Sequence, residues 1–382
     1  MKIGMTGPSG YGGVARTVAE LAIELTRRGH RVHLFTPTTP FHCVVPPDGL
    51  FLHHSMSDDI DSSRPLLVDW PARDFDRFLT LIFDVINSDG LDILHFHYAI
   101  PFASFSAAVR RRAGPSAPAL IGTLHGGDVT IVHKQPDKRD GLIRILGALD
   151  ALTTVSSAYA RLALDAFDLR THPVVIPNFV DLARFCPANE DSAGEIVNHP
   201  WPRIVHVSNF SPVKDTLSMA EIFLRIRERI KCELWLVGEG PNLSDVMSTI
   251  QQAGVRDDVR CWGWTSDVSS LLAQTSLLLM TSVTESFCMA ALEAMACGVP
   301  VLAPTVGGFP ELVHHRTTGY LFSPRDHAAA VNFATELLTN PVKHAAFKRA
   351  ARTQAFRFGQ GTVISMYENL YRSVMKSDQK YA

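Results

Sequence analysis

The sequence predicts an α/β protein made of two Rossmann-like, doubly wound parallel-sheet domains. Short apolar segments that are typical of buried strands alternate along the chain with segments of helical periodicity. The alternation occurs in two series, which a polar stretch over residues 187–202 separates. The chain has 382 residues, of which 46% are hydrophobic and 19% charged, so it is long and apolar enough for two separate cores.

The first series opens with a strand over residues 3–6, a glycine loop over 10–13 and a helix over 18–25. Gly29 is expected to end this helix, and a second strand follows over 32–35. The order strand, helix, strand favours a parallel sheet. Further strands are expected at residues 50–52, 93–96, 120–124, 151–155 and 174–176, and further helices at 75–87, 140–149 and 158–167.

The second series has the same character and ends in helices. Its strands are expected at residues 204–207, 234–237, 259–261, 277–280 and 299–303, with a helix at 290–296. We therefore expect an N-terminal domain over 1–180, a C-terminal domain over 181–360, and a C-terminal helix over 361–382 that could pack back on the N-terminal domain. Ligands of such sheets bind beyond the carboxyl ends of strands and often between domains, so an interdomain cleft is the expected site.

Composition excludes several other classes of protein. The net charge of −2 provides no basic field, so we expect no nucleic-acid partner. The six cysteines form no C-x-x-C pair, which indicates free thiols in a reducing compartment. The sequence shows no signal peptide and no apolar run of about 18 residues. We expect a cytoplasmic protein without membrane association, and a homo-oligomer remains open.

The most informative segment covers residues 284–300 and follows an apolar strand. Glu285 precedes a predicted helix whose N-terminal N–H groups would favour a bound phosphate. Glu293 lies eight positions later, a little over two helical turns, so we expect it on the same side. One carboxylate could accept hydrogen bonds from sugar hydroxyls and the other from a ribose diol. The alternative is that both are ordinary solvated or capping glutamates.

This segment resembles the signature of the large family of retaining GT-B glycosyltransferases, in which seven residues separate two glutamates. The resemblance extends over nearly the whole chain. It includes residues 10–13, 123–128, 177–181 with Phe185, Lys214, 237–241, 307–311 and 318–321. It implies a GT-B fold with an N-terminal acceptor-binding domain and a C-terminal sugar-nucleotide-binding domain. It also implies small-molecule substrates, namely a UDP-sugar and a carboxylated acceptor, with no cofactor and no metal.

The resemblance also implies roles for individual residues. The catalytic candidates are His125, Lys214 and Glu285; the donor-binding candidates are Gly12, Gly13, Asn209, Gly238, Phe287, Cys288, Met289 and Glu293; the acceptor-binding candidates are Tyr98, Thr123 and Arg144. Lys214 would hold the diphosphate and stabilise the charge that it gains on leaving. His125 would lie at the donor sugar, near its 6-hydroxyl. The alternatives are a surface lysine and a structural histidine.

Arg144 is the candidate for acceptor recognition because a guanidinium group binds a carboxylate through two parallel hydrogen bonds. The alternative is a solvated surface arginine. His95 and His97 could suggest a metal pair, but no third ligand has matching spacing. We therefore interpret this pair as packing residues.

Three shorter segments resemble one branch of the family, whose members join N-acetylglucosamine to L-malate for bacillithiol biosynthesis. They cover residues 91–101, 123–130 and 207–210. They imply transfer of N-acetylglucosamine from UDP-N-acetylglucosamine to malate with retention of configuration. Ser211 stands where that branch has arginine, and Cys288 where relatives usually have glycine. Two alternatives stay open: a related enzyme with another carboxylated or thiol-containing acceptor or another donor, and a non-catalytic sugar-nucleotide-binding protein.

Overall fold

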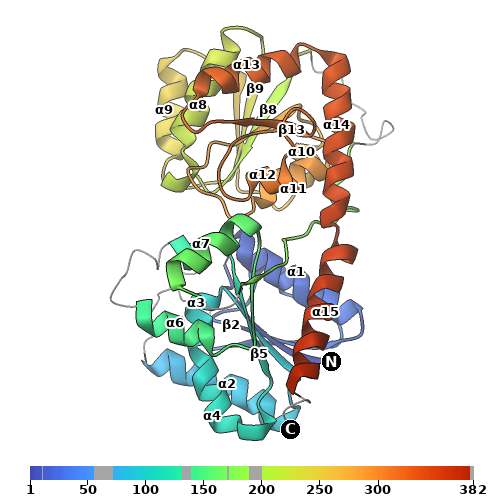
Figure 1. Cartoon of the computed structure of the whole chain (residues 1–382). Helices are drawn as coiled ribbons and strands as arrows, with labels where there is room; N and C mark the ends of the chain where they lie inside the picture. Colours follow the sequence, from blue (N-terminus) through green and yellow to red (C-terminus); the bar gives the residue numbers. More distant parts are fainter. Residues whose placement is uncertain (11, 56–71, 131–138, 170–171, 189–199, 379–382) are drawn as a thin grey trace. The chain divides into compact units, whose positions relative to one another are not determined.

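The computed structural model describes residues 1–10, 12–55, 72–130, 139–169, 172–188 and 200–378. The chain divides into two compact units (Figure 1). The first consists of residues 1–178 together with 361–382, and the second of residues 179–360. Within the described ranges, no helix is long and apolar enough to cross a membrane.

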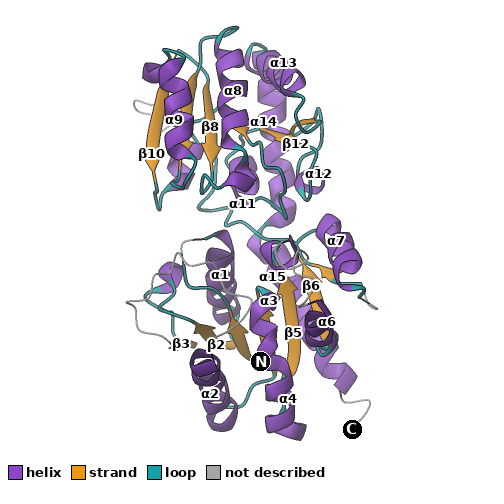
Figure 2. Ribbon diagram, turned by 90° about the vertical axis from the view of Figure 1, so that its left-hand side faces the viewer, coloured by secondary structure: helices purple, strands orange, loops and turns teal. Residues whose placement is uncertain are grey.

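In the described part of the first unit, seven strands form one parallel sheet in the order β3-β2-β1-β4-β5-β6-β7 (Figure 2). The strands are β1 (Lys2–Thr6), β2 (Arg31–Thr36), β3 (Leu50–His54), β4 (Ile93–His97), β5 (Ala119–Leu124), β6 (Ala151–Thr154) and β7 (Val174–Val175). The order reverses between β1 and β4. At such a switch point, neighbouring crossover connections leave in opposite directions and open a crevice at the carboxyl ends of the strands.

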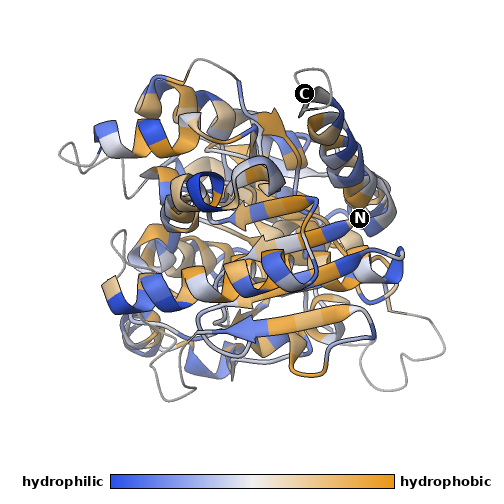
Figure 3. Cartoon of the chain, turned by 90° about the horizontal axis from the view of Figure 1, so that it is seen from below, coloured by the Kyte–Doolittle hydropathy of each residue, from blue (hydrophilic) through white to orange (hydrophobic). Residues whose placement is uncertain are grey.

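The helices of the first unit cover both faces of this sheet. They are α1 (Gly13–Arg27), α2 (Ala72–Ser88), α3 (Ala99–Phe102), α4 (Ser106–Ala113), α5 (Gly127–Thr130), α6 (Arg139–Gly147), α7 (Ser157–Phe167) and α15 (Gln360–Asp378). One core is rich in aromatic side chains, since Phe78 stacks on Phe105 at 5.0 Å and lies against Phe102 at 5.7 Å. In Figure 3 the strands are mostly orange, whereas the helices carry both orange and blue residues, as expected of helices that cover a sheet with one face and meet water with the other.

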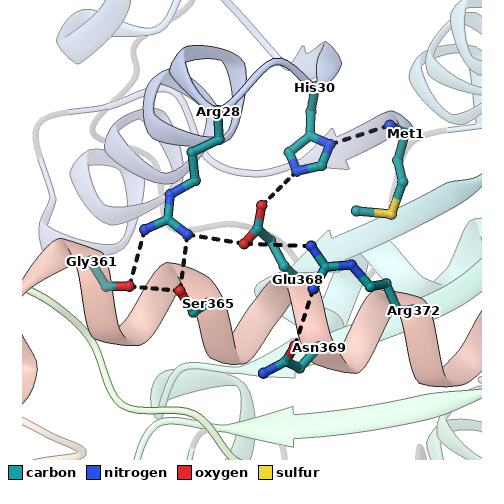
Figure 4. Close-up of polar contacts among 8 residues, drawn as sticks. All are labelled: Met1, Arg28, His30, Gly361, Ser365, Glu368, Asn369 and Arg372. Carbon is teal, nitrogen blue, oxygen red and sulfur yellow. Dashed lines mark hydrogen bonds and ion pairs between the residues drawn. The ribbon is translucent and has the colours of Figure 1, made fainter.

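Helix α15 lies beside α1 in this unit, and a polar cluster joins the two (Figures 1 and 4). The Arg28 guanidinium donates hydrogen bonds to Glu368, Ser365 and the Gly361 carbonyl, each at 3.0 Å. The other Glu368 oxygen lies 2.8 Å from His30 Nε2. Farther along the helix, the buried Tyr371 hydroxyl lies 2.8 Å from His95 Nδ1. Residues from the two ends of the chain thus complete one core.

In the described part of the second unit, six parallel strands follow the order β10-β9-β8-β11-β12-β13. The strands are β8 (Arg203–Val207), β9 (Glu233–Val237), β10 (Val259–Gly263), β11 (Leu277–Leu279), β12 (Val301–Pro304) and β13 (Gly319–Phe322). The helices are α8 (Thr216–Arg227), α9 (Leu243–Gln252), α10 (Val268–Leu272), α11 (Met289–Ala296), α12 (Phe309–Leu312), α13 (His327–Leu338) and α14 (Pro341–Ala355). The switch point lies between β8 and β11.

The two sheets confirm the predicted fold class of two Rossmann-like parallel-sheet units. One predicted strand needs a correction, because β12 begins at Val301 and not at Val299. The Val299 N–H donates to the Ala294 carbonyl at 2.8 Å, and Gly298 has a φ of +73°. Val299 therefore belongs to the C-terminal cap of α11, and Pro300 after it has no N–H to offer a neighbouring strand. The expected cleft between the units stays a prediction.

Candidate functional site

The second unit joins Lys214 and Glu285 at the switch point of its sheet. Lys214 ends the short turn Pro212–Lys214 that follows β8, and Glu285 lies in the loop after β11. The Lys214 ammonium donates to Glu285 Oε2 at 2.5 Å. The Thr281 hydroxyl donates to the carbonyl oxygens of Lys214 and Asp215 at 3.0 and 2.9 Å, which ties the two loops together. These side chains are partly exposed, at 20% for Lys214 and 11% for Glu285, so a ligand can reach them.

Glu285 is not part of a helix, which corrects the spacing argument that paired it with Glu293. Helix α11 begins only at Met289, because Cys288 has left-handed backbone angles with a φ of +74°. Glu293 lies within the helix and is 4% exposed. Glu285 precedes the helix, as predicted, but the expectation that a little over two helical turns bring Glu293 to the same side is wrong, because residues 285–288 are not helical. Glu285 projects from a loop, and its neighbour in space is Lys214.

Two glycines that were given no site role hold the Glu285 loop from the other side. The Gly308 N–H donates to the Glu285 carbonyl at 2.9 Å. Gly307 has a φ of +51°, and a Cβ on it would lie 1.8 Å from the same carbonyl oxygen. Two adjacent glycines a short distance after a strand are the sequence signal for so close an approach of two backbone segments. They lie within the segment 307–311 that the family resemblance includes.

The start of α11 brings three more predicted donor residues together. Phe287 is buried and packs edge-on against Phe358 at 5.6 Å. Burial, followed by the charge of Glu285, raises the pKa of the Cys288 thiol, so this side chain stays neutral. Met289 is the first residue of the helix. The N–H groups of a first helical turn favour a negatively charged ligand, such as a diphosphate, next to Lys214.

The remaining donor candidates lie at three chain segments. Asn209 is exposed, and its Oδ1 accepts a hydrogen bond from the Ser211 hydroxyl at 2.9 Å. Gly238 follows β9 with a φ of +110°, and its N–H donates to the Gly263 carbonyl at 2.7 Å. Gly12 and Gly13 are exposed in the first unit at the start of α1. A Cβ on either glycine would have no neighbour within 4 Å, so the space around them is open.

In the first unit, His125 follows β5 and lies 3.1 Å from His97 at the end of β4, measured from Nε2 to Nδ1. Asp128 holds this turn, because its carboxylate accepts the N–H groups of His125 and Gly126 at 3.0 and 2.8 Å. Burial raises the pKa of Asp128 to about 7, although these N–H donors act against the shift. Burial lowers the pKa of His125 to about 3, so its imidazole is neutral near pH 7.

His95 and His97 are fully buried, which confirms their interpretation as packing residues. His95 lies between the Tyr371 hydroxyl and the Thr123 hydroxyl, at 2.8 and 2.7 Å. Burial lowers the pKa of His95 to about 3 and that of His97 well below its usual value. Within the described ranges, no group of three or more histidine, cysteine, aspartate or glutamate side chains is placed to hold a metal ion.

The three acceptor candidates lie on different elements of the first unit. Thr123 is fully buried in β5, where its hydroxyl is hydrogen-bonded to His95 and, at 2.6 Å, to Thr153. Tyr98 follows β4 in a left-handed conformation and is half-buried, and burial raises the pKa of its hydroxyl. Arg144 is exposed on α6. No hydrogen bond among the described residues joins the three, and their acceptor roles stay predictions.

All six cysteines are free thiols, as predicted. Five are buried or partly buried, and Cys261 is exposed. Cys288 and Cys297 cap the two ends of α11, and the buried cysteines act as small apolar residues of the cores.

Two glycosyltransferase families match this chain, one in each half. The family described as "Glycosyl transferases group 1" matches residues 189–354, and "Glycosyltransferase Family 4" matches residues 11–184. The chain is 29% identical to the N-acetyl-alpha-D-glucosaminyl L-malate synthase of Bacillus anthracis, over 99% of this chain and 98% of the relative. It is 25% identical to a D-inositol 3-phosphate glycosyltransferase of Segniliparus rotundus, over 97% of this chain and 86% of the relative.

Solved structures share the fold over almost the whole length of the chain. A sucrose-phosphate synthase from Thermosynechococcus elongatus superposes with a TM-score of 0.81 at 19% identity, covering 99% of this chain and 100% of that one. The Anabaena protein HepE, in complex with UDP and glucose, superposes with a TM-score of 0.77 at 17% identity, covering 98% and 100%. The chain therefore belongs to the GT-B glycosyltransferases of group 1, with an amino-terminal half of the glycosyltransferase family 4 type.

Proposed function

We propose that this glycosyltransferase moves N-acetylglucosamine from UDP-N-acetylglucosamine to the hydroxyl group of L-malate, with retention of the anomeric configuration. The similarity to the malate synthase of Bacillus anthracis carries the proposal, because it extends over both units and leaves almost nothing of either chain unmatched. Six free thiols and the absence of C-x-x-C pairs support a cytoplasmic reaction.

In the donor half, Lys214 and the first turn of α11 would hold the diphosphate. The bond between sugar C1 and the diphosphate oxygen breaks, and UDP leaves with the electron pair. The malate hydroxyl oxygen bonds to C1 on the same face, and its proton passes to the leaving phosphate oxygen. Lys214 would stabilise the growing negative charge, so the scheme needs no metal. Because an ammonium group has three N–H donors, Lys214 can bind the phosphate while it keeps Glu285.

Glu285 would then accept hydrogen bonds from the sugar hydroxyls. Its loop is held by Gly308 through one hydrogen bond and by the contact of Gly307, which makes its position rigid. Glu293, buried in α11, would serve the ribose of the donor. Rigid placement of such groups is what allows binding energy to lower the barrier of transfer.

In the acceptor half, the exposed guanidinium of Arg144 would bind a malate carboxylate, and Tyr98 would donate its hydroxyl to the same ligand. Neutral His125 would contact the donor sugar without adding a positive charge, since burial keeps its pKa near 3. The scheme places every charged contact of the acceptor on Arg144, which makes that residue the clearest point to test.

A second acceptor is favoured by one observation, namely the 25% identity to a D-inositol 3-phosphate glycosyltransferase over 97% of this chain. A guanidinium group binds phosphate as readily as carboxylate. The acceptor would then be an inositol phosphate, and the donor half would act as before.

Mass spectrometry of reaction products tests the proposal. Purified protein is mixed with UDP-N-acetylglucosamine and either L-malate, D-inositol 3-phosphate or no acceptor, and the Lys214→Met variant serves as the inactive control. A malate-dependent glycoside supports the proposal. A glycoside only with the inositol phosphate supports the second acceptor. Release of UDP without glycoside means that both acceptors are wrong, and UDP binding without turnover supports a non-catalytic binding protein.

A further inference from the structure

His206 is a fully buried histidine of β8 that the proposed reaction does not use. Its Nδ1 lies 2.8 Å from the carbonyl oxygen of Leu279, the last residue of β11. Its Nε2 lies 2.8 Å from the Ser208 hydroxyl, and that hydroxyl accepts the Phe210 N–H at 3.1 Å. Three hydrogen bonds thus connect the end of β11 to the loop that follows β8.

The chemistry of these groups sets the direction of every bond. A carbonyl oxygen only accepts, so His206 Nδ1 carries the proton and donates to Leu279. Burial lowers the pKa of His206 to about 4, so near pH 7 its Nε2 is an unprotonated acceptor. Ser208 therefore donates its hydroxyl proton to Nε2 and uses an oxygen lone pair to accept the Phe210 N–H. Both imidazole nitrogens of His206 are thus used, Nδ1 as a donor and Nε2 as an acceptor.

The loop that these hydrogen bonds hold ends at Lys214. Phe210 is buried with a φ of +43°, a conformation that a non-glycine residue keeps only when its surroundings hold it there. The Lys214 N–H donates to the Ser211 carbonyl at 2.9 Å. A Cβ on Gly238, the residue after β9, would lie 1.9 Å from the Ser208 carbonyl oxygen, so the backbone that follows β9 packs directly against this loop.

We propose that His206 is a positioning residue for the donor diphosphate: it fixes the 208–214 loop to the end of β11 and so places Lys214 next to Glu285. The inference rests on the proposed function, because it takes Lys214 as the group that binds the diphosphate. Leu279 is followed directly by the loop that carries Glu285. The imidazole is therefore a link, besides the Thr281 hydroxyl, between the two chain segments that form the ion pair.

Three substitutions separate this role from a general contribution to folding. In His206→Gln the side-chain amide reaches about as far as Nε2 and can keep the bond to Ser208. In His206→Asn the amide reaches only as far as Nδ1, so the bond to Leu279 can persist while the loop is released. Ser208→Ala removes the same link from the loop side and leaves the imidazole in place, which makes it the mildest change for folding.

UDP binding by titration calorimetry is the main measurement, with the KM values of donor and acceptor and the melting temperature alongside. We expect His206→Asn and Ser208→Ala each to weaken UDP binding by about tenfold, the equivalent of one hydrogen bond. His206→Gln should weaken UDP binding to a similar extent, because it keeps the bond to Ser208 but loses the bond to Leu279 that fixes the loop to β11. The double variant His206→Asn with Ser208→Ala should bind no more weakly than either single variant, because both break one link. The acceptor KM should not change.

One result would overturn only the role of His206, and another would overturn the proposed function as well. If wild-type protein binds UDP but all three variants bind it equally well and only their melting temperatures fall, His206 is merely structural and the inference is overturned. If wild-type protein does not bind UDP, the proposed function itself fails, and the role of His206 fails with it.

Discussion

Replacing Gly307 with alanine tests whether the position of Glu285 controls turnover. A Cβ at residue 307 would lie 1.8 Å from the Glu285 carbonyl oxygen, whereas real Cβ atoms stay at least 3.0 Å away. The two backbone segments must therefore separate by about 1.2 Å, the difference between these distances. Because a displacement of about 1 Å in a catalytic group can cost about 100-fold in rate, we expect kcat/KM to fall by about 100-fold.

Gly254→Ala is the matched control for this variant. Gly254 also lies in the second unit with a positive φ, of +72°, but a Cβ on it would have no neighbour within 4 Å. Both variants bear the cost of a left-handed alanine, about 1–2 kcal/mol of stability. Only Gly307→Ala adds the clash with the Glu285 loop. The difference between the two variants therefore isolates the displacement of Glu285 from backbone strain.

The assay combines steady-state kinetics with urea unfolding of both variants. Gly254→Ala should lose stability but keep kcat/KM within about twofold of wild type, since the new Cβ meets no atom within 4 Å. Equal kcat/KM values for the two variants, at similar stability, would refute the reasoning. A loss of activity in Gly307→Ala that accompanies complete unfolding at the assay temperature would count against it as well, because the loop would then matter only for folding.

Three further predictions concern the site and the buried histidines. Glu285→Gln should lower kcat by about 10–100-fold but weaken UDP binding by less than about threefold, because Lys214 remains and only the sugar contact changes. Equal losses in kcat and in UDP affinity would contradict the contact between Glu285 and the sugar. Arg144→Ala should raise the acceptor KM by at least about tenfold and spare the donor KM, with the exposed Arg161→Ala as control; a shift in the donor KM instead means that the acceptor site lies elsewhere. Between pH 7 and pH 5 the free energy of unfolding should fall by about 2 kcal/mol for each histidine whose folded pKa is near 3, which applies to His95 and His125. The sign follows because the unfolded chain takes up protons from about pH 6.5 downward while the buried imidazoles do not; His95→Gln should show a shallower pH dependence in urea unfolding than wild type.

The fold was largely readable from the sequence because strands buried on both faces of a parallel sheet are continuous apolar runs. Residues 234–237 and 277–279 are examples, and both lie within observed strands. The errors arose where backbone conformation, not polarity, decides the structure. Residues 285–288, with Cys288 at a positive φ, lie outside α11, so a count of helical turns from Glu285 to Glu293 does not hold. Val299 is as apolar as a strand residue but caps the helix before it.

The sequence by itself determined the types of element, their order in two series, and the residue types available for a sugar-nucleotide site. Only the tertiary structure decided which side chains meet. Lys214 and Glu285 are 71 positions apart, and they pair because the strand order places β8 next to β11. His97 reaches His125 and His206 reaches Leu279 for the same reason, across neighbouring strands. A side chain's partner depends on strand order, register and loop conformation, and these follow from the packing of the whole sheet rather than from local sequence.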